Sequence, residues 1–345
     1  MELGERLALG IEAATFERVA DIGFRNAELN APHIKRSVLE LAKTPLGSGE
    51  SAVVVGAGPS LHRRRSLQRL RASSFTGTIV AADGALGACL KAGVVPHLVV
   101  SVDPHGERIV RWFGDPTLTA PREDDYFRRQ EMDPAHHDDE HGANREVEAN
   151  RTLVELVNTH GPKLKLAAAT SAAVQVVKRC EEVGMDIYWF NPMFDDYDMP
   201  GSLSRKAWEM NGLPCLNGGG NVGTAAWALT HAVLGKRHIG LIGIDLGYAP
   251  GTPPEKTQYF KELRDLRPHD YLDAFMHEKN PDTGEIWFSD PSYHWFRKVF
   301  VEMIRDADCE TVNCTEGGLL FGDGITTATL DSFLETVAGG ADHHG

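Results

Sequence analysis

A glycine-rich loop after a short apolar run is the part of the sequence best suited to binding a ligand. Residues 52–55 predict a strand buried on both faces, because the run is apolar and too short for a helix. Gly56 and Gly58, which follow, permit a tight turn where backbone N–H groups come close to a phosphate. Pro59 and Ser60 then begin a helix, for which Pro59 is suited because it lacks an N–H. Leu61 takes the place of the third glycine in the dinucleotide fingerprint, so we expect a nucleotide-phosphate loop and not an NAD site. An ordinary strand-to-helix turn is the alternative interpretation.

Three further strands are each predicted to end at an aspartate. Asp83 follows residues 78–82, Asp103 follows residues 97–102, and Asp245 ends the strand that begins at residue 238. The carboxyl ends of parallel strands meet at one edge of the sheet, which is where open α/β sheets bind ligands. Asp83 and Asp103 are each suited to a ribose hydroxyl or a metal ion. An aspartate after a strand is also a common helix cap, which is the alternative for each of them.

A second glycine-rich loop precedes a helix of small residues that is predicted to run to about Leu234. Its candidate ligand-binding residues are Asn217, Gly219, Gly220 and Asn221. A loop of this kind at a helix N-terminus is a second place where an anion can bind. The alternative is that the small residues only allow the helix to pack closely on the sheet.

Strands alternate with helices along most of the chain, which predicts an α/β fold with a doubly wound, mostly parallel sheet. We expect an N-terminal helical segment over residues 1–48, followed by a nucleotide-binding core over residues 49–250. A polar insertion interrupts this core at about residues 114–149. Residues 251–345 are expected to form a C-terminal helical and loop extension that completes the core.

The composition excludes several classes of partner. The formal net charge of the 345-residue chain is −14, which disfavours a nucleic-acid interface. No apolar run approaches the length of a membrane span, and the first 20 residues lack a signal-peptide core. The five cysteines are scattered without a CxxC motif, which predicts reduced thiols and a cytoplasmic location.

Four segments resemble a known family: VGAGPSL, AADGALGACLKAGVVPHLVVSVDP, GGGNVGTAAWALTHAVLGKRHIGLIGIDLGY and NCTEGGLLFGDGI. They are similar to the motility-associated-factor (Maf) glycosyltransferases, whose core is shared with the 6-hydroxymethylpterin diphosphokinase MptE-like proteins. The resemblance implies a Rossmann-like core related to the bacterial sialyltransferase fold. It also implies transfer of a nonulosonic, sialic-acid-like sugar from a CMP donor to flagellin, in flagellum protein glycosylation.

For a nucleotide-sugar transferase, we expect the candidate residues to have the following roles. The N–H groups from Gly56 to Ser60 would hold the donor phosphate, with Asp83 near the ribose and the loop from Asn217 to Asn221 closing the other side. Asp245 is a further nucleotide-binding candidate. His105, beside Asp103, is the expected general base for the acceptor hydroxyl. In the glycosyltransferase branch the segment TEGG is a family feature, which places Glu316 on the acceptor side.

Two alternatives remain open. The segment from Asp83-Gly84 onward is similar to pterin and thiamine pyrophosphokinases, in which a later pair of aspartates binds magnesium. Only Asp103 is present at that position here, and Mg²⁺ is needed for diphosphoryl transfer but not for the glycosyltransferase activity. The other alternative is a non-catalytic nucleotide-binding protein of a surface-glycan pathway. The acceptor, whether protein or small molecule, is not identified by the sequence.

The polar insertion is expected to act as a lid. Its charged composition cannot bury enough apolar surface to offset the entropy of ordering it. It follows the strand that ends at Asp103, so we expect it beside the ligand and ordered when the donor binds. Arg122, Arg128 or Arg129 would then reach a phosphate.

Overall fold

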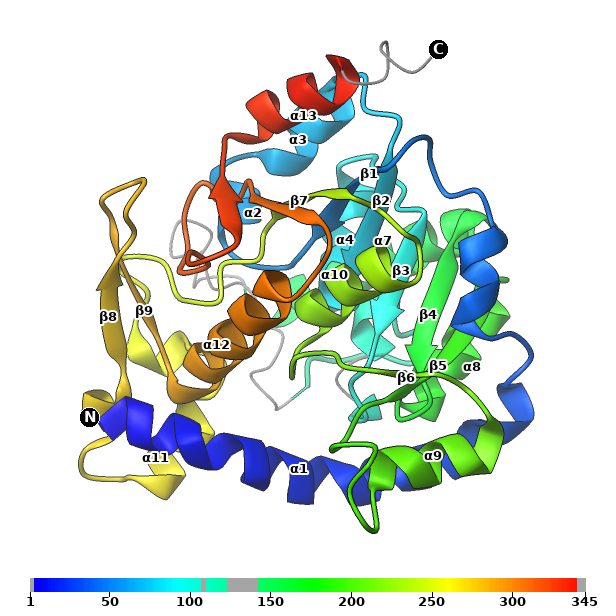
Figure 1. The fold of residues 1–345 in the computed structure, drawn as a ribbon, viewed down its shortest axis with the longest axis horizontal. Coiled ribbons are helices and arrows are strands. Elements are labelled where there is room, and N and C mark those ends of the chain that lie inside the picture. Colours follow the sequence, from blue (N-terminus) through cyan, green and yellow to red (C-terminus); the bar gives the residue numbers. More distant parts are fainter. Residues whose placement is uncertain (1–2, 107–109, 123–141, 340–345) are drawn as a thin grey trace.

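The structure, a computed structural model, describes residues 3–106, 110–122 and 142–339. Within these residues a nine-stranded sheet has the order β11-β10-β7-β1-β2-β3-β4-β5-β6, and each neighbouring pair runs parallel. Helices cover both faces of the sheet (Figure 1). The expected Rossmann-like, doubly wound α/β fold is therefore confirmed.

The strands follow the apolar runs of the sequence closely. Those of the large sheet are β1 (Ser51–Val55), β2 (Thr78–Ala82), β3 (Leu98–Ser101), β4 (Lys165–Ala169), β5 (Asp186–Pro192), β6 (Cys215–Leu216), β7 (His238–Ile242), β10 (Glu310–Asn313) and β11 (Ile325–Thr327). A separate antiparallel hairpin is formed by β8 (Met276–Lys279) and β9 (Ile286–Ser289). Its strands are not predicted by the sequence pattern.

In the described residues after β1, the α-helices are α2 (Ser60–Arg63), α3 (Ser66–Ala72), α4 (Asp83–Lys91), α7 (Gly142–His160), α8 (Val174–Glu182), α9 (Leu203–Asn211), α10 (Val222–Ala232), α11 (Phe260–Leu266), α12 (Pro291–Arg305) and α13 (Leu330–Gly339). The N-terminal α1 (Leu3–Asn30) runs along one end of the molecule and contacts both α8 and α12 (Figure 1). Short 3-10 turns at Ala31–His33 and Val38–Lys43 connect it to the sheet.

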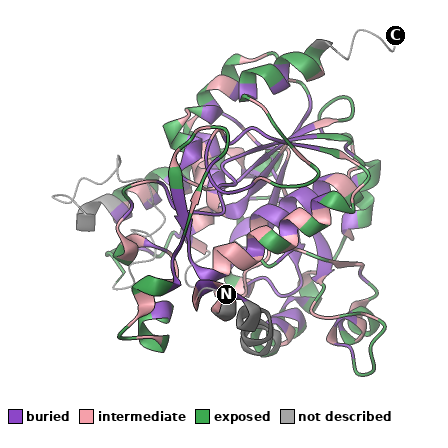
Figure 2. Ribbon diagram, turned by 60° about the vertical axis from the view of Figure 1, so that its left-hand side comes forward, coloured by how far each residue is buried: buried purple, intermediate pink, exposed green. Residues whose placement is uncertain are grey.

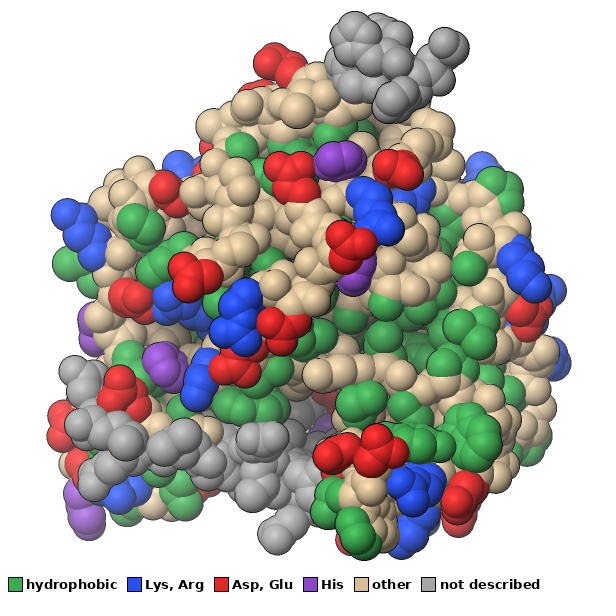
Figure 3. All heavy atoms as spheres, viewed as in Figure 1, with side chains coloured by type: hydrophobic (Ala, Val, Ile, Leu, Met, Phe, Trp, Pro, Cys, Tyr) green, Lys and Arg blue, Asp and Glu red, His purple; other side chains and the backbone are tan. Residues whose placement is uncertain are grey.

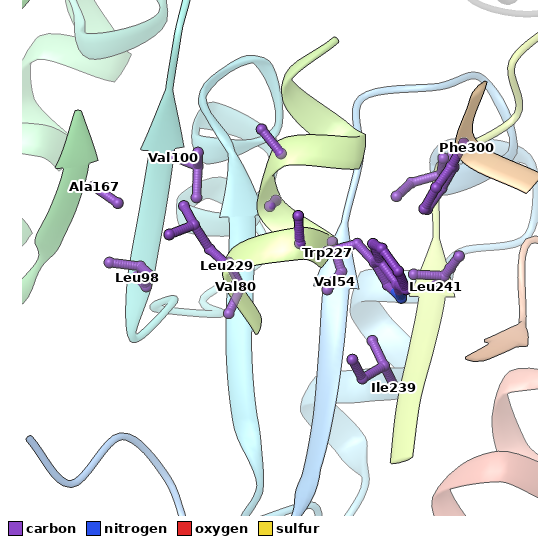
Figure 4. Packing of buried hydrophobic residues seen from close by; sticks show 14 of the residues in the cluster. Val54, Val80, Leu98, Val100, Ala167, Trp227, Leu229, Ile239, Leu241 and Phe300 are labelled. Carbon is purple, nitrogen blue, oxygen red and sulfur yellow. The ribbon is translucent and has the colours of Figure 1, made fainter. Parts of the chain in front are cut away.

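Alternate side chains of the strands pack against different helices, because successive residues of a strand point to opposite faces. Val54 packs with α10 and α12, as Figure 4 shows for Trp227 and Phe300. Val53 and Val55 pack on the other face with α3, α4 and α13. Farther along that face, α4, α7 and α8 cover β3 and β4. The sheet is thus buried between two helical layers (Figure 2).

The order in which the strands are added to the sheet changes side between β1 and β7, although these two strands are parallel. From β1 the chain proceeds through β2, β3, β4 and β5 to one side, whereas β7 and β10 lie on the other. Val53 of β1 is accordingly in register with Ile79 of β2 and with Gly240 of β7. In open α/β sheets the ligand lies outside the carboxyl ends of the strands at such a reversal. The expected site therefore lies where β1 and β7 end.

The arginine-rich residues 61–71 do not form one continuous helix. They belong to α2 and α3, which are separate. Arg65, between them, has a left-handed backbone with φ +52°, which a continuous helix cannot include. As a consequence α2 has only four residues and a correspondingly small dipole.

No helix in the described part of the chain is long and apolar enough to cross a membrane. Acidic and basic side chains are interspersed on the face drawn in Figure 3. The five cysteines carry free thiols, of which Cys89, Cys180 and Cys314 are buried.

Candidate functional site

A cleft of about 1210 Å³ lies at the carboxyl ends of the central strands. Most of the expected site residues line it: Gly56, Gly58, Pro59, Asp83, Asp103, His105, Asn217, Gly219, Gly220, Asn221 and Asp245. Residues more than 180 positions apart in the chain therefore share one cavity. Ser60 and Glu316, which were also expected at the site, do not line it.

The N–H groups of the first glycine-rich loop are largely used within the protein. The N–H of Gly56 donates to the carbonyl of Ile242 over 2.8 Å, and the N–H of Gly58 donates to that of Gly243 over 2.7 Å. The N–H and the hydroxyl of Ser60 donate to Oδ2 of Asp245 over 3.2 and 2.9 Å. A phosphate at this loop would have to compete with these bonds, so the phosphate-binding role of residues 56 to 60 stays a prediction.

The two glycines of this loop are explained by contact with the end of β7. A Cβ added to Gly56 would lie 2.3 Å from the carbonyl oxygen of Gly243. A Cβ added to Gly58 would lie 2.0 Å from Oδ2 of Asp245. Both distances are far below van der Waals contact, so only glycine fits. The glycines thus allow two strand ends to approach each other, which the sequence pattern cannot distinguish from an approach to a ligand.

The second glycine-rich loop leaves more of its N–H groups unpaired. Asn221 is the N-cap of α10, and its side chain accepts a hydrogen bond from the N–H of Thr224 over 3.0 Å. Within the residues that the structure describes, the N–H groups of Gly220, Val222 and Gly223 have no hydrogen-bond partner. The first N–H groups of a helix point away from it and attract negative charge. All three residues line the cleft.

Asp245 lies just after β7, and within the described part of the chain its carboxylate has a hydrogen-bond partner at only one oxygen. The residue is 2% exposed and lines the cleft, and its Oδ1 has no hydrogen-bond partner among the described residues. Burial raises the pKa of Asp245 to about 7, although the hydrogen bonds from Ser60 and the charges of Arg63 and Arg64 act in the opposite direction. The next residue, Leu246, has φ +46°, an uncommon backbone conformation for a leucine.

Asp83, in contrast, has both carboxylate oxygens bonded. Oδ1 accepts from the N–H of Gly84 over 2.7 Å, and Oδ2 accepts from the hydroxyl of Ser101 over 2.8 Å. The residue is 4% exposed. Burial raises the pKa of Asp83 to about 7; the bond from Ser101 lowers it, and the nearby charge of Asp103 raises it. Asp83 therefore needs no ligand to satisfy it.

Asp103 and His105 form a pair on the cleft wall. Oδ1 of Asp103 lies 2.9 Å from Nδ1 of His105 and accepts the His105 backbone N–H over 2.7 Å. Each side chain is 36% exposed. A carboxylate beside Nδ1 favours the tautomer with the proton on that nitrogen, which leaves Nε2 as a proton acceptor. The geometry therefore suits His105 to general-base chemistry on a hydroxyl in the cleft.

The N-terminal helix holds this part of the cleft in place, which the sequence analysis missed. The side-chain amide of Asn26 donates to the carbonyls of Pro104 and Ser171 over 3.0 and 2.9 Å. One turn later, the amide of Asn30 donates to the carbonyls of Thr170 and Ala172 over 2.9 and 2.7 Å. Two asparagines four positions apart on one helix face are the signal that could have indicated this role.

The sequence analysis also missed an aromatic wall on the side of the cleft formed by α11 and α12. Tyr259, Tyr293 and Trp295 line it. The hydroxyl of Tyr293 donates to Gln258, whose backbone N–H donates to the hydroxyl of the buried Tyr248. The density of aromatic residues after Pro250 was visible in the sequence, but nothing there indicated that these residues face the ligand edge.

Glu316 lies in contact with α3 and α13. Its Oε1 is 2.7 Å from Nη1 of Arg69 and accepts the N–H of Leu330, the first residue of α13, over 3.1 Å. Its φ of +54° is in the left-handed region. These contacts give Glu316 a structural function, and its acceptor-side role stays a prediction.

The sequence also offered Asp103 as a metal ligand under the diphosphokinase alternative, and it predicted phosphate-binding arginines in the insertion at about residues 114–149. Over residues 3–106, 110–122 and 142–339, no three His, Cys, Asp or Glu side chains lie close enough together to hold a metal ion. Arg128 and Arg129 fall outside the described residues, as does most of the expected lid. Arg122 is described, and its Nη2 lies 3.8 Å from Oδ2 of Asp115.

Comparison with known proteins agrees with part of the expected resemblance. Residues 25–111 match the family model described as 6-hydroxymethylpterin diphosphokinase MptE-like, so this part of the chain is similar to that family, as expected. An uncharacterized protein of Treponema pallidum (strain Nichols) is 32% identical over 81 residues, which are 23% of this chain and 36% of that protein. The structure of a Maf glycosyltransferase from Magnetospirillum magneticum AMB-1 is similar with a TM-score of 0.49 and 14% identity. This similarity covers 86% of the present chain but 37% of the glycosyltransferase, so the chain matches little more than a third of either relative.

Proposed function

We propose that this protein is a nucleotide-sugar-dependent glycosyltransferase, which uses a CMP-linked, sialic-acid-like donor. The observation that carries the proposal is the Asp103–His105 pair on the wall of a cleft large enough for a nucleotide sugar. Glycosyl transfer to a hydroxyl requires a base for the hydroxyl proton and stabilisation of the departing phosphate. The cleft offers both kinds of group.

The proposed reaction uses these groups in three ways. The acceptor hydroxyl gives its proton to Nε2 of His105, while Asp103 stabilises the imidazolium that forms. The acceptor oxygen forms a bond to the anomeric carbon of the donor sugar as the bond from that carbon to the phosphate oxygen breaks. The leaving phosphate takes the electron pair, and unpaired backbone N–H groups of the cleft stabilise its charge.

A diphosphokinase is the second candidate, because the family model that matches residues 25–111 bears that name. Such an enzyme transfers diphosphate from ATP with the help of magnesium, which Asp103 would have to hold. Oδ1 of Asp103 is bonded to His105, and both oxygens of Asp83 are bonded within the protein. These residues fit a magnesium ion less well than a pair of free carboxylates would. A non-catalytic nucleotide-binding role is the third candidate.

Turnover of a CMP-linked nonulosonic acid tests these candidates directly. We expect hydrolysis or transfer by the wild type, and a decrease of about 100- to 10,000-fold in His105→Ala, as is usual for loss of a general base. CMP binding should persist in that variant. Equal turnover in His105→Ala would contradict the base assignment, and CMP binding without any turnover would favour the non-catalytic role. The acceptor and the cytoplasmic location stay predictions.

A further inference from the structure

The two glycine-rich loops differ in how many of their backbone N–H groups are already hydrogen-bonded within the protein. In the loop after β1, the N–H groups of Gly56, Gly58 and Ser60 are paired within the protein, and α2 is a single short turn. At α10, a helix of 11 residues, the N–H groups of Val222 and Gly223 are unpaired among the described residues. An anion therefore finds two consecutive free donors at the start of α10, whereas among residues 56–60 only the N–H of Ala57 lacks a partner in the described part of the chain.

The strand-end carboxylates differ in the same way. Both oxygens of Asp83 accept hydrogen bonds from the protein. Oδ1 of Asp245 accepts none from the described residues, although the side chain is 98% buried and lines the cleft. A buried polar atom without a partner is costly and rare in folded proteins. A ligand group in the cleft is the partner that would satisfy it.

These two features lie close together. A Cβ added to Gly223 would lie 3.6 Å from the side chain of Ile244, the residue that precedes Asp245. The first turn of α10 therefore packs against the end of β7. Val222, Gly223 and Asp245 also line the same cleft.

We propose that α10 binds the phosphate of the nucleotide through the N–H groups of Val222 and Gly223, while Oδ1 of Asp245 binds a ribose hydroxyl of the same nucleotide. This inference rests on the proposed function for the ligand class. The phosphate is thereby assigned to α10 and not to the loop at Gly56, and the ribose is assigned to Asp245 and not to Asp83. The cleft thus recognises a phosphate and a hydroxyl on one ligand.

A hydroxyl group suits Asp245 for a chemical reason. A hydroxyl both donates and accepts hydrogen bonds, whereas an ammonium only donates and a phosphate dianion only accepts. Because the pKa of Asp245 is raised to about 7 by burial, both forms of the carboxyl group are present near neutral pH. A hydroxyl can pair with Oδ1 in either form.

Replacing Val222 by proline tests the phosphate site with little effect on the fold. Val222 is the first residue of α10, where proline is well tolerated and where the N–H is unpaired. Asn221, which would precede the proline, already has the extended backbone (φ −146°, ψ 158°) that this requires. Val222→Ala is the matched control, because it shortens the side chain but keeps the N–H.

Calorimetry with CMP, AMP and cytidine then gives the readout. We expect Val222→Pro to bind both nucleotides about tenfold more weakly than Val222→Ala, since one hydrogen bond to a charged group is lost. Cytidine, which has no phosphate, should bind equally to the two variants. Equal CMP affinities in Val222→Pro and Val222→Ala would overturn the phosphate assignment, and so would the absence of binding by any nucleotide.

A ligand without ribose hydroxyls tests Asp245 with the protein unchanged. We expect 2′,3′-dideoxy-CMP to bind wild type about tenfold more weakly than CMP, because Oδ1 is then left unpaired. This difference should disappear in Asp245→Ala and persist in Asp83→Asn. Equal binding of the two ligands by wild type would overturn the assignment, as would a difference abolished only in Asp83→Asn. A failure of sugar transfer alone would contradict the proposed function and leave these binding results standing.

Discussion

Oδ2 of Asp245 accepts hydrogen bonds from both the backbone N–H and the hydroxyl of Ser60. A carboxylate of the protein thus occupies the N-terminus of α2, where the sequence motif predicted a phosphate. The two residues are 185 positions apart, and their contact joins the ends of β1 and β7. The glycine-rich loop is therefore part of the structural framework of the cleft.

Gly58→Ala tests this framework. The new Cβ would lie 2.0 Å from Oδ2 of Asp245 and 2.8 Å from the carbonyl oxygen of Gly243, so one strand end must move. We expect a loss of stability of about 2 kcal/mol or more, as for other overpacked sites, measured by urea unfolding. Gly87→Ala in α4 is the control, because its Cβ would meet nothing closer than 3.4 Å; it should be neutral or slightly stabilising. If Gly58→Ala were as stable as wild type, the close approach would be wrong.

The stability of the protein should depend on pH through its buried carboxyl groups. Burial raises the pKa of Asp245 to about 7, well above the value of 3.8 expected in the unfolded chain. The folded state therefore holds this proton more tightly, so its contribution to stability is complete below about pH 4 and is lost as the pH rises through 7. Each unit of pKa difference corresponds to about 1.4 kcal/mol, so the change amounts to a few kcal/mol.

Asp245→Asn should reduce this decline, because the amide does not ionise and can still accept from Ser60. Urea unfolding at pH 5.5 and pH 8 would measure the change in slope. Asp323→Asn, at an exposed position, is the control and should keep the wild-type slope. Asp83 and Asp290, whose pKa values burial raises to about 7 and about 6, would keep part of the dependence in the variant. An identical slope in wild type and Asp245→Asn would contradict the prediction.

Asn26 should affect catalysis by positioning the segment that carries His105. Asn26→Ala removes the donors to the carbonyls of Pro104 and Ser171, so we expect kcat to fall about tenfold as His105 shifts. Asn30→Ala is matched in chemistry and burial but does not contact residue 104. Each variant should lose about 1–3 kcal/mol of stability. Equal kcat values in the two variants would show that Asn26 has no special role.

Substitution of Glu316 should lower the stability of the protein without changing its catalytic activity. Glu316→Ala removes one of the two carboxylate partners of Arg69, which keeps Asp331, and the acceptor for the first N–H of α13. We expect a loss of about 1 kcal/mol, typical of a helix cap, with kcat and KM unchanged. Glu316→Gln keeps the acceptor and should lose less. A large decrease in kcat without a loss of stability would restore the acceptor-side role implied by the family resemblance.

Apolar runs and turn residues were sufficient to predict most of the fold. Residues 78–82 form a strand with the expected bounds, because a short apolar run between turn signals has few alternatives. The hairpin of β8 and β9 was missed, since its strands contain charged residues such as Glu278 and Lys279. The break at Arg65 was also missed, because its left-handed backbone has no signal in a run of arginines.

The candidate site was predicted less completely than the fold. Strand ends placed Asp103, His105 and Asp245 at one edge, since the carboxyl ends of parallel strands must meet there. The sequence could not show which N–H groups and carboxylate oxygens are already bonded, because those bonds join residues far apart in the chain. Satisfied groups such as Asp83 and unsatisfied ones such as Asp245 look alike in a sequence.

Calorimetric titration with CMP, repeated in the presence of ATP and magnesium, tests the central proposal most directly. The cleft is proposed to bind the nucleotide of a CMP-linked sugar, so CMP should bind with measurable heat and ATP with magnesium should compete only weakly. His105→Ala should bind CMP as wild type does, because His105 acts on the acceptor. Clear preference for ATP with magnesium, or no binding of CMP, would contradict the account and favour the diphosphokinase.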